Sequence, residues 1–321
     1  MRLLTFDELS ESADADRLLV HVTTLGGATN RRSVDLWRRR SNYYAPYAGI
    51  FAVEGATVLG QVLVKRLPYT FRDRTETVTA VASVGTRADR ARRGIASKLL
   101  EEVHRRERAD GIRFATLWTN RSWGAVRVYE RLGYEGIYSI PFALRPAPRA
   151  RVRPPSLRGV RRAGRSDLAE LEELRERLAE GRIGFCHRPE RFLETSTATW
   201  EIDPPHEILV VRDRGRAEGY VVVRSNPYRL ICGELVATTP RVAERLVAAV
   251  ERAADDRPTV LEGSAVADRK ALLGRRGYRL LEKSYGVFMA RPLDGRWDAR
   301  TAIRAFATDD PRFLCQVGDR F

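Results

Sequence analysis

The sequence has few cysteines and histidines, and this scarcity excludes several kinds of site. Of its 321 residues, three are cysteine and four are histidine. Cys186, Cys232 and Cys315 are scattered, so we expect no disulfide framework and a reducing, cytoplasmic setting. The histidines show no metal-ligand spacing, and we expect no metal. Cys186 stands next to His187, but adjacent residues rarely face each other, so we interpret this pair as part of a loop.

The sequence also lacks a long apolar run. No stretch of about 18 apolar residues exists, so we expect no membrane span and no membrane partner. The N-terminal segment MRLLTFDELSESADADRLL is acidic and interrupted by polar residues, unlike a secretory signal. Apolar residues make up 43% of the chain and charged residues 31%, as in ordinary globular proteins, and the length favours two domains.

Lysine is scarce as well, so the formal net charge of +15 comes almost entirely from arginine. A charge of this size invites nucleic acid as a partner. The arginines are spread along the whole chain, however, and the sequence shows no interleaving of aromatic and basic residues of the RNA-binding kind. We therefore do not expect a nucleic-acid partner, although a basic surface would still attract a polyanionic cofactor.

A segment rich in proline and arginine divides the chain. RPAPRARVRPPSLRG, residues 145–159, has no apolar periodicity and is typical of a linker. On both sides the pattern predicts a helix, a strand pair with a tight turn, a third strand, a long helix, a fourth strand and a short helix. The short helix ends within ERLGY at 130–134 in one half and in LGRRGY at 273–278 in the other.

The repeated order predicts a chain of two α+β units. Each is expected to be a mostly antiparallel mixed sheet flanked by helices. The strands are expected at 47–67 (a pair), 75–86 and 112–119 in the first unit, and at 206–225 (a pair), 230–238 and 258–266 in the second. The expected boundaries are 1–146 for the first domain, 147–157 for the linker, 158–293 for the second domain and 294–321 for a tail.

A basic loop with one glycine follows the third strand of the first unit. RARRGIASKLL, residues 90–100, places three arginines around Gly94 just before a helix. A helix N-terminus carries backbone N–H groups without partners and a partial positive charge, and glycine lets an anion approach them. Arg92 and Arg93 would add charge-assisted bonds to phosphate oxygens. On this stretch alone, an arginine-rich surface helix with an incidental glycine is an equally good interpretation.

The flanking sequence decides between these interpretations. The P-loop pattern GxxxxGK[ST] is absent, and no GxGxxG follows the strand. The segment SVGTRADRARRGIASKLLEEV, followed by TLWTNRSWGAVRVYERLGY, instead resembles the GNAT superfamily of N-acetyltransferases, and the resemblance covers the first half nearly end to end. The two-unit chain resembles the tandem-domain branch, which includes the enhanced-intracellular-survival-type enzymes.

Two motifs carry the resemblance. The family loop usually reads [QR]-x-x-G-x-[GA]; Gly94 and Ala96 fit it, and Ala91 stands at its first position. The second family motif reads N-x-x-A-x-x-x-Y-E-x-x-G-[FY]. Ser122 stands where its asparagine often falls, and Asn120 lies two residues earlier. The residues that match the rest of this motif are Ala125, Tyr129, Glu130, Gly133 and Tyr134.

The resemblance implies acetyl-CoA as co-substrate, bound in a gap between two strands that part. Parting frees backbone groups that would otherwise pair, and these would bond the pantetheine arm. The residues implied for the pantetheine are Val84, Gly85 and Thr86. Those implied for the pyrophosphate are Arg92, Arg93, Gly94, Ile95, Ala96 and Ser97, with Asn120 and Ser122 contacting the cofactor from the end of the next strand.

The implied reaction is direct transfer of an acetyl group to an amine of a small molecule or peptide. The Val84 N–H would stabilise the charge that develops on the carbonyl oxygen, and Tyr129 matches the general acid of the family. A packed aromatic ring is the alternative for Tyr129. For the base, Glu76 is one candidate, with a solvated strand end as its alternative, and the C-terminal carboxylate of Phe321 is another, because the tandem-domain relatives bring theirs to the active site.

The second unit departs from the family at both motifs. No basic glycine loop follows GELVAT, and Leu273 stands where the first unit has Tyr129. We therefore expect a degenerate unit that does not bind acetyl-CoA and that packs on the first unit, walls the acceptor cleft or forms a homodimer surface. Trp37, Tyr43 and Tyr44 lie in the region that forms the acceptor wall in the family, where they either line a pocket or pack in the core.

Two other function classes remain open from the sequence. One is a non-catalytic acyl-CoA-binding regulatory protein of the same fold, which release of free thiol with a panel of amines would separate from an enzyme. The other is a basic nucleic-acid-binding module, which salt-sensitive retention on DNA without CoA binding would indicate.

Overall fold

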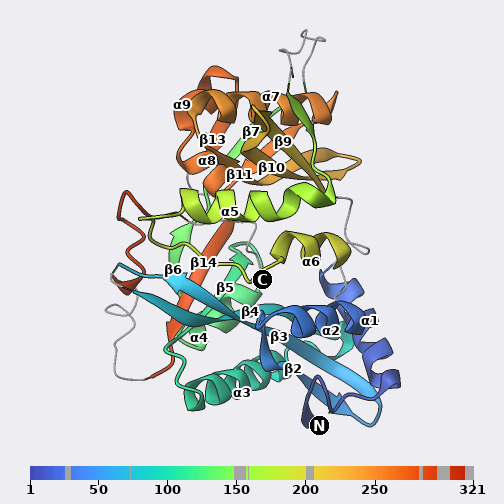
Figure 1. The fold of residues 1–321 in the computed structure, drawn as a ribbon. Coiled ribbons are helices and arrows are strands. Elements are labelled where there is room, and N and C mark those ends of the chain that lie inside the picture. Colours follow the sequence, from blue (N-terminus) through green and yellow to red (C-terminus); the bar gives the residue numbers. More distant parts are fainter. Residues whose placement is uncertain are drawn as a thin grey trace.

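Each half of the chain contributes most of a seven-stranded sheet with helices on both faces. The computed structural model describes residues 1–25, 30–72, 74–147, 157, 159–199, 206–281, 285–294 and 304–314. In spatial order, the first sheet consists of β1 (Arg2–Thr5), β2 (Tyr44–Glu54), β3 (Thr57–Thr70), β4 (Thr75–Thr86), β5 (Phe114–Asn120), β14 (Gly286–Pro292) and β6 (Glu135–Ser139). Figure 1 shows this sheet in the lower part of the molecule.

The two faces of the first sheet have separate hydrophobic cores. The helices α1 (Glu11–Leu25) and α2 (Arg31–Arg40) cover one face, where Val34 packs with Phe51 and Leu63. The helices α3 (Ile95–Ala109) and α4 (Ala125–Arg131) cover the other face, where Leu99 packs with Val62. This division follows from the alternation of side chains along each strand.

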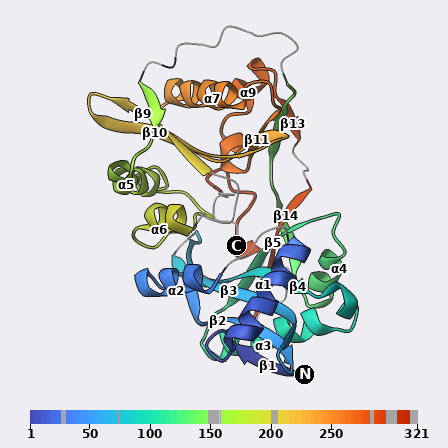
Figure 2. The same cartoon turned by 90° about the vertical axis from the view of Figure 1, so that its right-hand side faces the viewer.

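The second sheet has an equivalent strand order. It runs β13 (Arg279–Leu281), β7 (Phe142–Arg145), β12 (Thr259–Glu262), β11 (Arg229–Ala237), β10 (Arg216–Asn226), β9 (His206–Asp213) and β8 (Val160–Arg162). Its outer face packs on α7 (Pro240–Ala254), near α8 (Ser264–Ala267) and α9 (Lys270–Arg275). The helices α5 (Leu168–Leu178) and α6 (Phe192–Thr199) of the second unit lie between the two sheets in both views (Figures 1 and 2). Two short 3-10 helices are η1 (Ala88–Arg90) and η2 (Arg165–Asp167).

The expected fold class is confirmed. Both sheets are antiparallel except at one position, where β4 lies parallel to β5 and β11 lies parallel to β12. The parallel pair falls at the same place in the two units, as expected for a repeat. Within the described ranges, no helix combines the length and the apolar character needed to cross a bilayer.

The two units exchange one strand each, which the sequence did not predict. β7, which we assigned to the first domain, lies between β13 and β12 of the second sheet. β14, which we assigned to the second domain, lies between β5 and β6 of the first sheet, and its pairs run from Gly286↔Asn120 to Pro292↔Phe114. The expected ranges 1–146 and 158–293 therefore do not coincide with the two sheets, and most of the expected linker lies outside the described residues.

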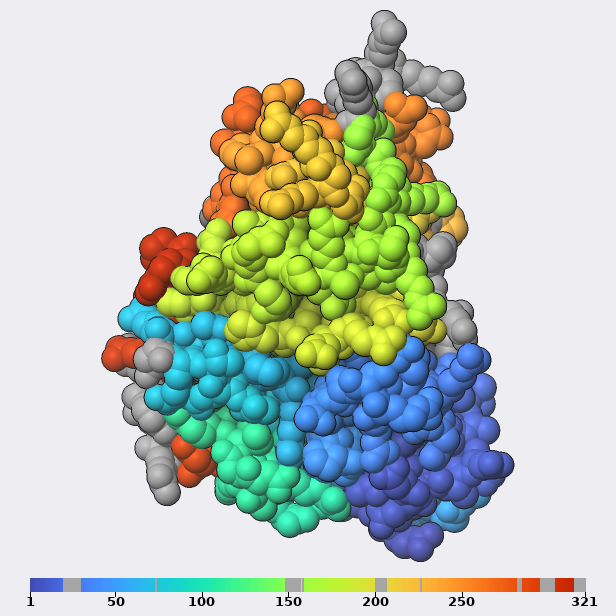
Figure 3. Space-filling view, viewed as in Figure 1, coloured from blue at the N-terminus to red at the C-terminus, as the bar shows by residue number. Residues whose placement is uncertain are grey.

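A shared hydrophobic core joins the units. Trp37 of α2 packs against Phe192 of α6 with ring centroids 5.2 Å apart, and the same cluster continues to Leu171 of α5 and Tyr220 of β10. The yellow-green band of α5 and α6 in Figure 3 touches the blue first unit on one side and the orange second unit on the other. Burial of this size and apolar character makes a hinge between the units unfavourable.

The described part of the tail returns to the first sheet. Phe306 is fully buried, and its ring centroid lies 5.1 to 5.3 Å from those of Tyr69, Phe71 and Phe114. Further along, Phe313 packs on Tyr138 of β6 at 4.9 Å. The tail thus belongs to the face of the first sheet that meets the second unit.

Candidate active site

The strands β4 and β5 pair over three residues and then part. Their parallel register runs from Thr79↔Ala115 to Val81↔Leu117. Beyond Val81, β4 stays paired with β3 as far as Gly60↔Thr86, while β5 continues to Asn120 paired with β14. The last residues of β4 therefore have no ladder on the side that faces β5, and their backbone groups on that side are available to a ligand. The expected pantetheine residues Val84, Gly85 and Thr86 lie there.

A β-bulge re-aims the end of β4. The register with β3 shifts between Gln61↔Gly85 and Leu63↔Ala82, so β4 carries one extra residue. Ser83 takes a positive φ of 51°, and its carbonyl accepts a 3.3 Å hydrogen bond from the Gln61 side-chain amide. Bulges turn a strand locally and often lie beside active sites. The sequence analysis missed this bulge, since a single serine carries no signal for it.

The loop before α3 is exposed, and it ends in a left-handed backbone conformation that favours glycine. Gly94 is the N-cap with φ 75°, and a Cβ built there would meet no atom within 4 Å. The first helical bond runs from Lys98 N–H to the Gly94 carbonyl at 3.1 Å. The N–H groups of Ile95, Ala96 and Ser97 precede that bond and have no helical partner. The loop thus leaves backbone donors open toward solvent, as the anion interpretation requires.

Two arginines of this loop have no acidic partner in the described part of the chain. Arg92 and Arg93 are exposed, and no ion pair is formed by either. Their neighbour Arg87, by contrast, pairs with Asp16 at 2.9 Å and with Asp89 at 3.2 Å. Arg92 and Arg93 are therefore positioned beside the helix N-terminus with their charge uncompensated, which favours a bound polyanion.

Asn120 and Ser122 form the turn between β5 and α4. The Asn120 side-chain oxygen accepts hydrogen bonds from the Ser122 N–H at 2.9 Å and the Ser122 hydroxyl at 2.7 Å. The side-chain N–H groups of Asn120 remain as donors. Both residues lie at the end of β5, across the gap from the end of β4.

Tyr129 lies on the inner face of α4. It is 7% exposed, and its ring meets that of Tyr134 edge-on with centroids 5.9 Å apart. Burial raises the pKa of Tyr129 to about 12. Within the described chain its hydroxyl forms no hydrogen bond, yet it is not among the fully enclosed polar atoms. The phenol therefore keeps its proton at neutral pH and has a free donor to offer.

Comparison with known proteins gives a match over this half of the chain. Residues 5–137 match the model of the acetyltransferase (GNAT) domain family. We call this matching part of the chain, residues 5–137, the GNAT domain. A comparison with curated protein sequences gives no match.

Solved structures resemble the whole chain, beyond the GNAT domain itself. A GCN5-related N-acetyltransferase from Kribbella flavida is 24% identical and covers 92% of this chain and 71% of its own, with a TM-score of 0.63. One from Anabaena variabilis is 12% identical, with coverages of 91% and 72% and a TM-score of 0.67. Eis1 from Mycobacterium abscessus is 18% identical, with coverages of 92% and 74% and a TM-score of 0.57. At these identities the likeness is one of fold.

Glu76 does not join the other candidate residues of the GNAT domain. It stands at the start of β4, eight residues before Val84, and a strand of that length spans roughly 26 Å. Its carboxylate pairs with Arg74 and, at 2.9 Å, with Arg113. Glu76 is therefore an ion-paired carboxylate at the end of β4 opposite the gap, which favours the alternative of a strand-end residue over a base.

The C-terminal carboxylate lies outside the described residues, and so does Phe321. The described tail ends at Leu314, whose N–H donates to the Ile183 carbonyl at 2.7 Å. Its neighbour Phe313 clusters with Ile183 and with the partly buried Trp118. Trp118 follows directly on Leu117, the last residue of β5 that pairs with β4. The tail thus approaches the gap of the GNAT domain from the side of the second unit.

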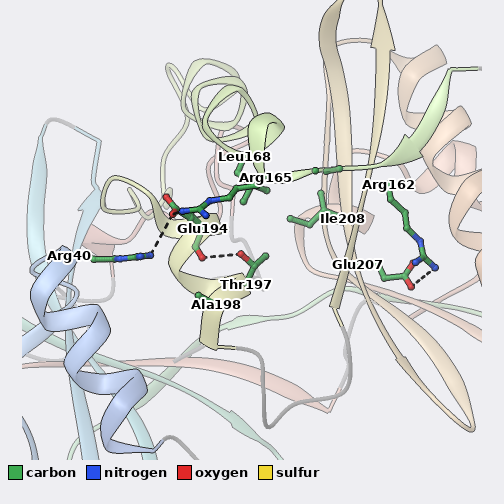
Figure 4. Close-up of a pocket in the computed structure, with 11 residues that line it drawn as sticks. Arg40, Arg162, Arg165, Leu168, Glu194, Thr197, Ala198, Glu207 and Ile208 are labelled. Carbon is green, nitrogen blue, oxygen red and sulfur yellow. Dashed lines mark hydrogen bonds and ion pairs between the residues drawn. The ribbon is translucent and has the colours of Figure 1, made fainter.

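The expected acceptor-wall aromatics pack in the shared core. Trp37, Tyr43 and Tyr44 are all buried, and the Trp37 and Tyr43 rings are 4.5 Å apart. A cavity of about 630 Å³ lies nearby, between α2, α6 and the second sheet (Figure 4). Its arginines are matched by acids: Arg165 pairs with Glu194 at 2.7 Å, and Arg162 with Glu207 at 2.8 Å. No residue of β4, β5 or α3 lines it, so it is separate from the gap.

Cys186 and His187 do not form a nucleophile–base pair. The His187 ring bonds the Glu176 carboxylate and the Thr70 hydroxyl, at 2.7 and 2.8 Å, and does not engage the thiol. The backbone of this segment pairs antiparallel with the end of β3, where the Thr70 N–H donates to the Phe185 carbonyl at 2.8 Å. The two residues therefore attach the second unit to the GNAT domain.

Sequence reasoning also missed Gly60 of β3. A Cβ there would lie 2.9 Å from the Gly85 carbonyl oxygen and 2.9 Å from Ile95. Only a residue without a side chain lets the start of α3 and the end of β4 approach β3 this closely. Gly60 therefore helps to set the position of the helix N-terminus in the GNAT domain. A glycine inside an apolar strand, VLGQV, was the available signal.

Proposed function

We propose that this chain is an acetyl-CoA-dependent N-acetyltransferase that moves an acetyl group to an amine of a small molecule or peptide by direct attack. The observation that carries the proposal is the parting of β4 from β5 beside an open helix N-terminus, within a GNAT domain. Unpaired backbone groups in a strand gap and free N–H groups at a helix start are complementary to an amide-rich arm and a diphosphate.

The residues of the gap fit acetyl-CoA by their chemistry. Backbone groups of Val84, Gly85 and Thr86 would bond the pantetheine amides, and the helix start at Gly94 to Ser97 would hold the pyrophosphate, assisted by Arg92 and Arg93. Asn120 would donate from the end of β5. When bound, acetyl-CoA supplies an acetyl thioester, which is activated toward an amine.

Within this proposal Tyr129 acts as a hydrogen-bond donor to the departing sulfur. Its pKa of about 12 lies above the value of about 8.5 for an ordinary thiol. Complete proton transfer from the phenol to a thiolate is therefore uphill, while donation of a hydrogen bond stabilises the thiolate as it forms. The Val84 N–H would stabilise the carbonyl oxygen from the other side of the gap.

For the base we propose the C-terminal carboxylate of Phe321. The described tail packs toward Trp118 and Tyr138, and the seven residues that follow Leu314 can span up to ~23 Å. A chain lacking its last four residues should lose most of its turnover while binding acetyl-CoA as before. Unchanged turnover in that truncated chain would exclude the carboxylate.

A second candidate function, a non-catalytic acyl-CoA-binding regulatory protein, has one observation in its favour. Glu76, the one carboxylate on β4, is neutralised and remote from the gap. In such a protein the gap would bind acyl-CoA, and no amine would release free thiol from it.

A two-step assay tests the proposal against this rival. Acetyl-CoA at ~100 times its Kd should stabilise the chain by about 2.7 kcal/mol, measured as a rise in Tm. A panel of amines, including amines that carry a carboxylate or phosphate, is then assayed for release of free thiol. Release with at least one amine supports the transferase, binding without release supports the regulator, and the absence of both contradicts the two proposals.

A further inference from the structure

The second unit keeps a cavity of its own where the GNAT domain has its gap. β11 and β12 pair over three residues, from Leu230↔Thr259 to Cys232↔Leu261, and then part. A cavity of about 510 Å³ lies beyond them, lined by the end of β11, the start of α7 and the segment after β12. This volume is typical of small-molecule sites.

The backbone of this cavity is closed to a pantetheine arm. Leu235 lies three residues beyond the last pair at Cys232, as Val84 lies three beyond Val81. The Arg269 guanidinium bonds the Leu235 carbonyl at 3.3 Å and the Ser264 carbonyl at 2.7 Å, so one side chain links the end of β11 to the start of α8. A strand-like ligand would have to displace this bridge.

The start of α7 also differs from that of α3. Pro240 has no N–H to offer, and the Thr239 hydroxyl accepts from the Val242 N–H at 3.2 Å. A diphosphate would find few open backbone donors there. The cavity therefore suits a ligand other than acyl-CoA, and its polar side chains must define which one.

Polar groups of the cavity lack partners. Ser264 is 3% exposed, and its hydroxyl forms no hydrogen bond in the described chain. The Nε–H of Arg269 is likewise enclosed without an acceptor. Leaving a buried hydroxyl or a buried guanidinium N–H without a hydrogen bond costs free energy of folding. Ser264 and Arg269 both belong to the lining of the same cavity, while these two atoms are themselves enclosed.

The charge of the lining is unbalanced. Among the described residues that line it, Asp268 is the one acid, and it is engaged by Arg182 at 3.0 Å. Arg269 bonds only carbonyl oxygens, and Arg275 forms no ion pair with any described residue. A guanidinium removed from water without a counter-ion favours a bound anion. The lining also contains the apolar side chains of Leu178, Leu272 and Leu314.

We propose that this cavity binds a small organic oxyanion, a carboxylate or phosphate monoester with a short apolar body. The oxyanion would accept hydrogen bonds from the terminal N–H groups of Arg269 that the two carbonyls leave free, with Arg275 at the rim. The apolar body would lie against Leu178, Leu272 and Leu314. This site is distinct from the gap of the GNAT domain.

Calorimetric titration of the full chain tests the proposal with three six-carbon probes: hexanoate, hexyl phosphate and hexanol. Ionic strength is held constant with chloride. We expect saturable binding of hexanoate, hexyl phosphate or both, the two arms distinguishing a carboxylate from a phosphate ligand, and no saturable binding of hexanol. Absence of binding by both anions, or hexanol binding as tightly as they do, would overturn the proposal.

Two variants locate the binding. Arg275→Ala and Arg275→Glu both change an exposed side chain, so both should fold; the first should weaken anion binding about tenfold, and the second should weaken it further because like charges repel. Arg279→Ala, an exposed arginine of β13 outside the cavity lining, is the matched control and should bind as wild type. Wild-type affinity in both cavity variants would also overturn the proposal. Acetyl-CoA titrated into the same variants should bind unchanged, so failure here is distinguishable from failure of the proposed transferase.

Discussion

Tyr129 carries the most specific residue-scale expectation. Tyr129→Phe removes one hydroxyl and leaves the packed ring, so acetyl-CoA affinity should stay within about twofold while turnover falls roughly a hundredfold. Steady-state kinetics with a calorimetric Kd separates the two effects. Tyr228→Phe, a change at an exposed tyrosine of the second unit, is the control and should retain full turnover. Equal turnover in Tyr129→Phe would refute its role.

His104 of α3 predicts how stability depends on pH. It is 3% exposed, bonds the Tyr134 hydroxyl at 2.8 Å, and accepts from Arg291 of β14 at 2.7 Å. Burial, with the charges of Arg291 and Arg108, lowers the pKa of His104 to about 3. In the unfolded chain the pKa of His104 is about 6.5. Between pH ~6.5 and pH ~3, the unfolded chain therefore binds up to one more proton at His104 than the folded chain does.

The stability contributed by neutral His104 is thus present above pH ~6.5 and is lost as the pH falls toward the folded value. The free energy of unfolding should drop by up to ~1.4 kcal/mol per pH unit from this group. Urea unfolding from pH 7 to pH 4 measures the slope. His104→Gln should be less stable at pH 7 and show a shallower slope; an identical slope would contradict the assignment.

At the scale of elements, the loop before α3 should govern cofactor affinity through charge as well as backbone. Replacing both Arg92 and Arg93 by Gln should weaken acetyl-CoA binding about tenfold and flatten its salt dependence, because exposed charges are screened by salt. Calorimetry at two salt concentrations measures this. Arg279→Gln, which changes an exposed arginine of the second unit, serves as the control. Wild-type affinity in the double variant would contradict the role of Arg92 and Arg93 in binding the pyrophosphate.

Most single elements could be predicted from the sequence, because the periodicity of apolar residues and the turn residues that bound an element are local. The strand expected at 75–86 is β4 to the residue, and the strand pair expected at 206–225 is β9 and β10. The exchange of β7 and β14 could not be predicted, since side chains of a short strand define its faces but not the sheet that it joins. A similar limit applies to Glu76, because the sequence of β4 does not show at which end of the strand the gap opens.

For the site, the motifs could indicate the loop before α3 and the helix that carries Tyr129, because backbone freedom and helix spacing are local properties; the roles of these residues stay predictions. Gly94 has a positive φ, which glycine adopts readily, and Tyr129 lies on the buried face of α4. The bulge at Ser83 and the approach allowed by Gly60 depend on the register between β3 and β4, which no single segment encodes.

At the scale of the whole molecule, the strand exchange makes the two units interdependent. A fragment of residues 1–146 lacks β14, so β5 and β6 would each expose an unpaired edge, and β7 would have no sheet. We expect this fragment to show no cooperative thermal transition by circular dichroism, while the full chain unfolds cooperatively. A cooperative transition with native-like near-UV signal in the fragment would show that the exchange is dispensable.

The central claim is that the gap between β4 and β5, next to the open start of α3, binds acetyl-CoA. A crystal structure of the chain with acetyl-CoA tests it most directly. The account predicts pyrophosphate oxygens within hydrogen-bonding distance of the N–H groups from Gly94 to Ser97 and the pantetheine arm between Val84 and Asn120. Acetyl-CoA bound elsewhere, or a gap that stays empty at saturating ligand, would contradict it.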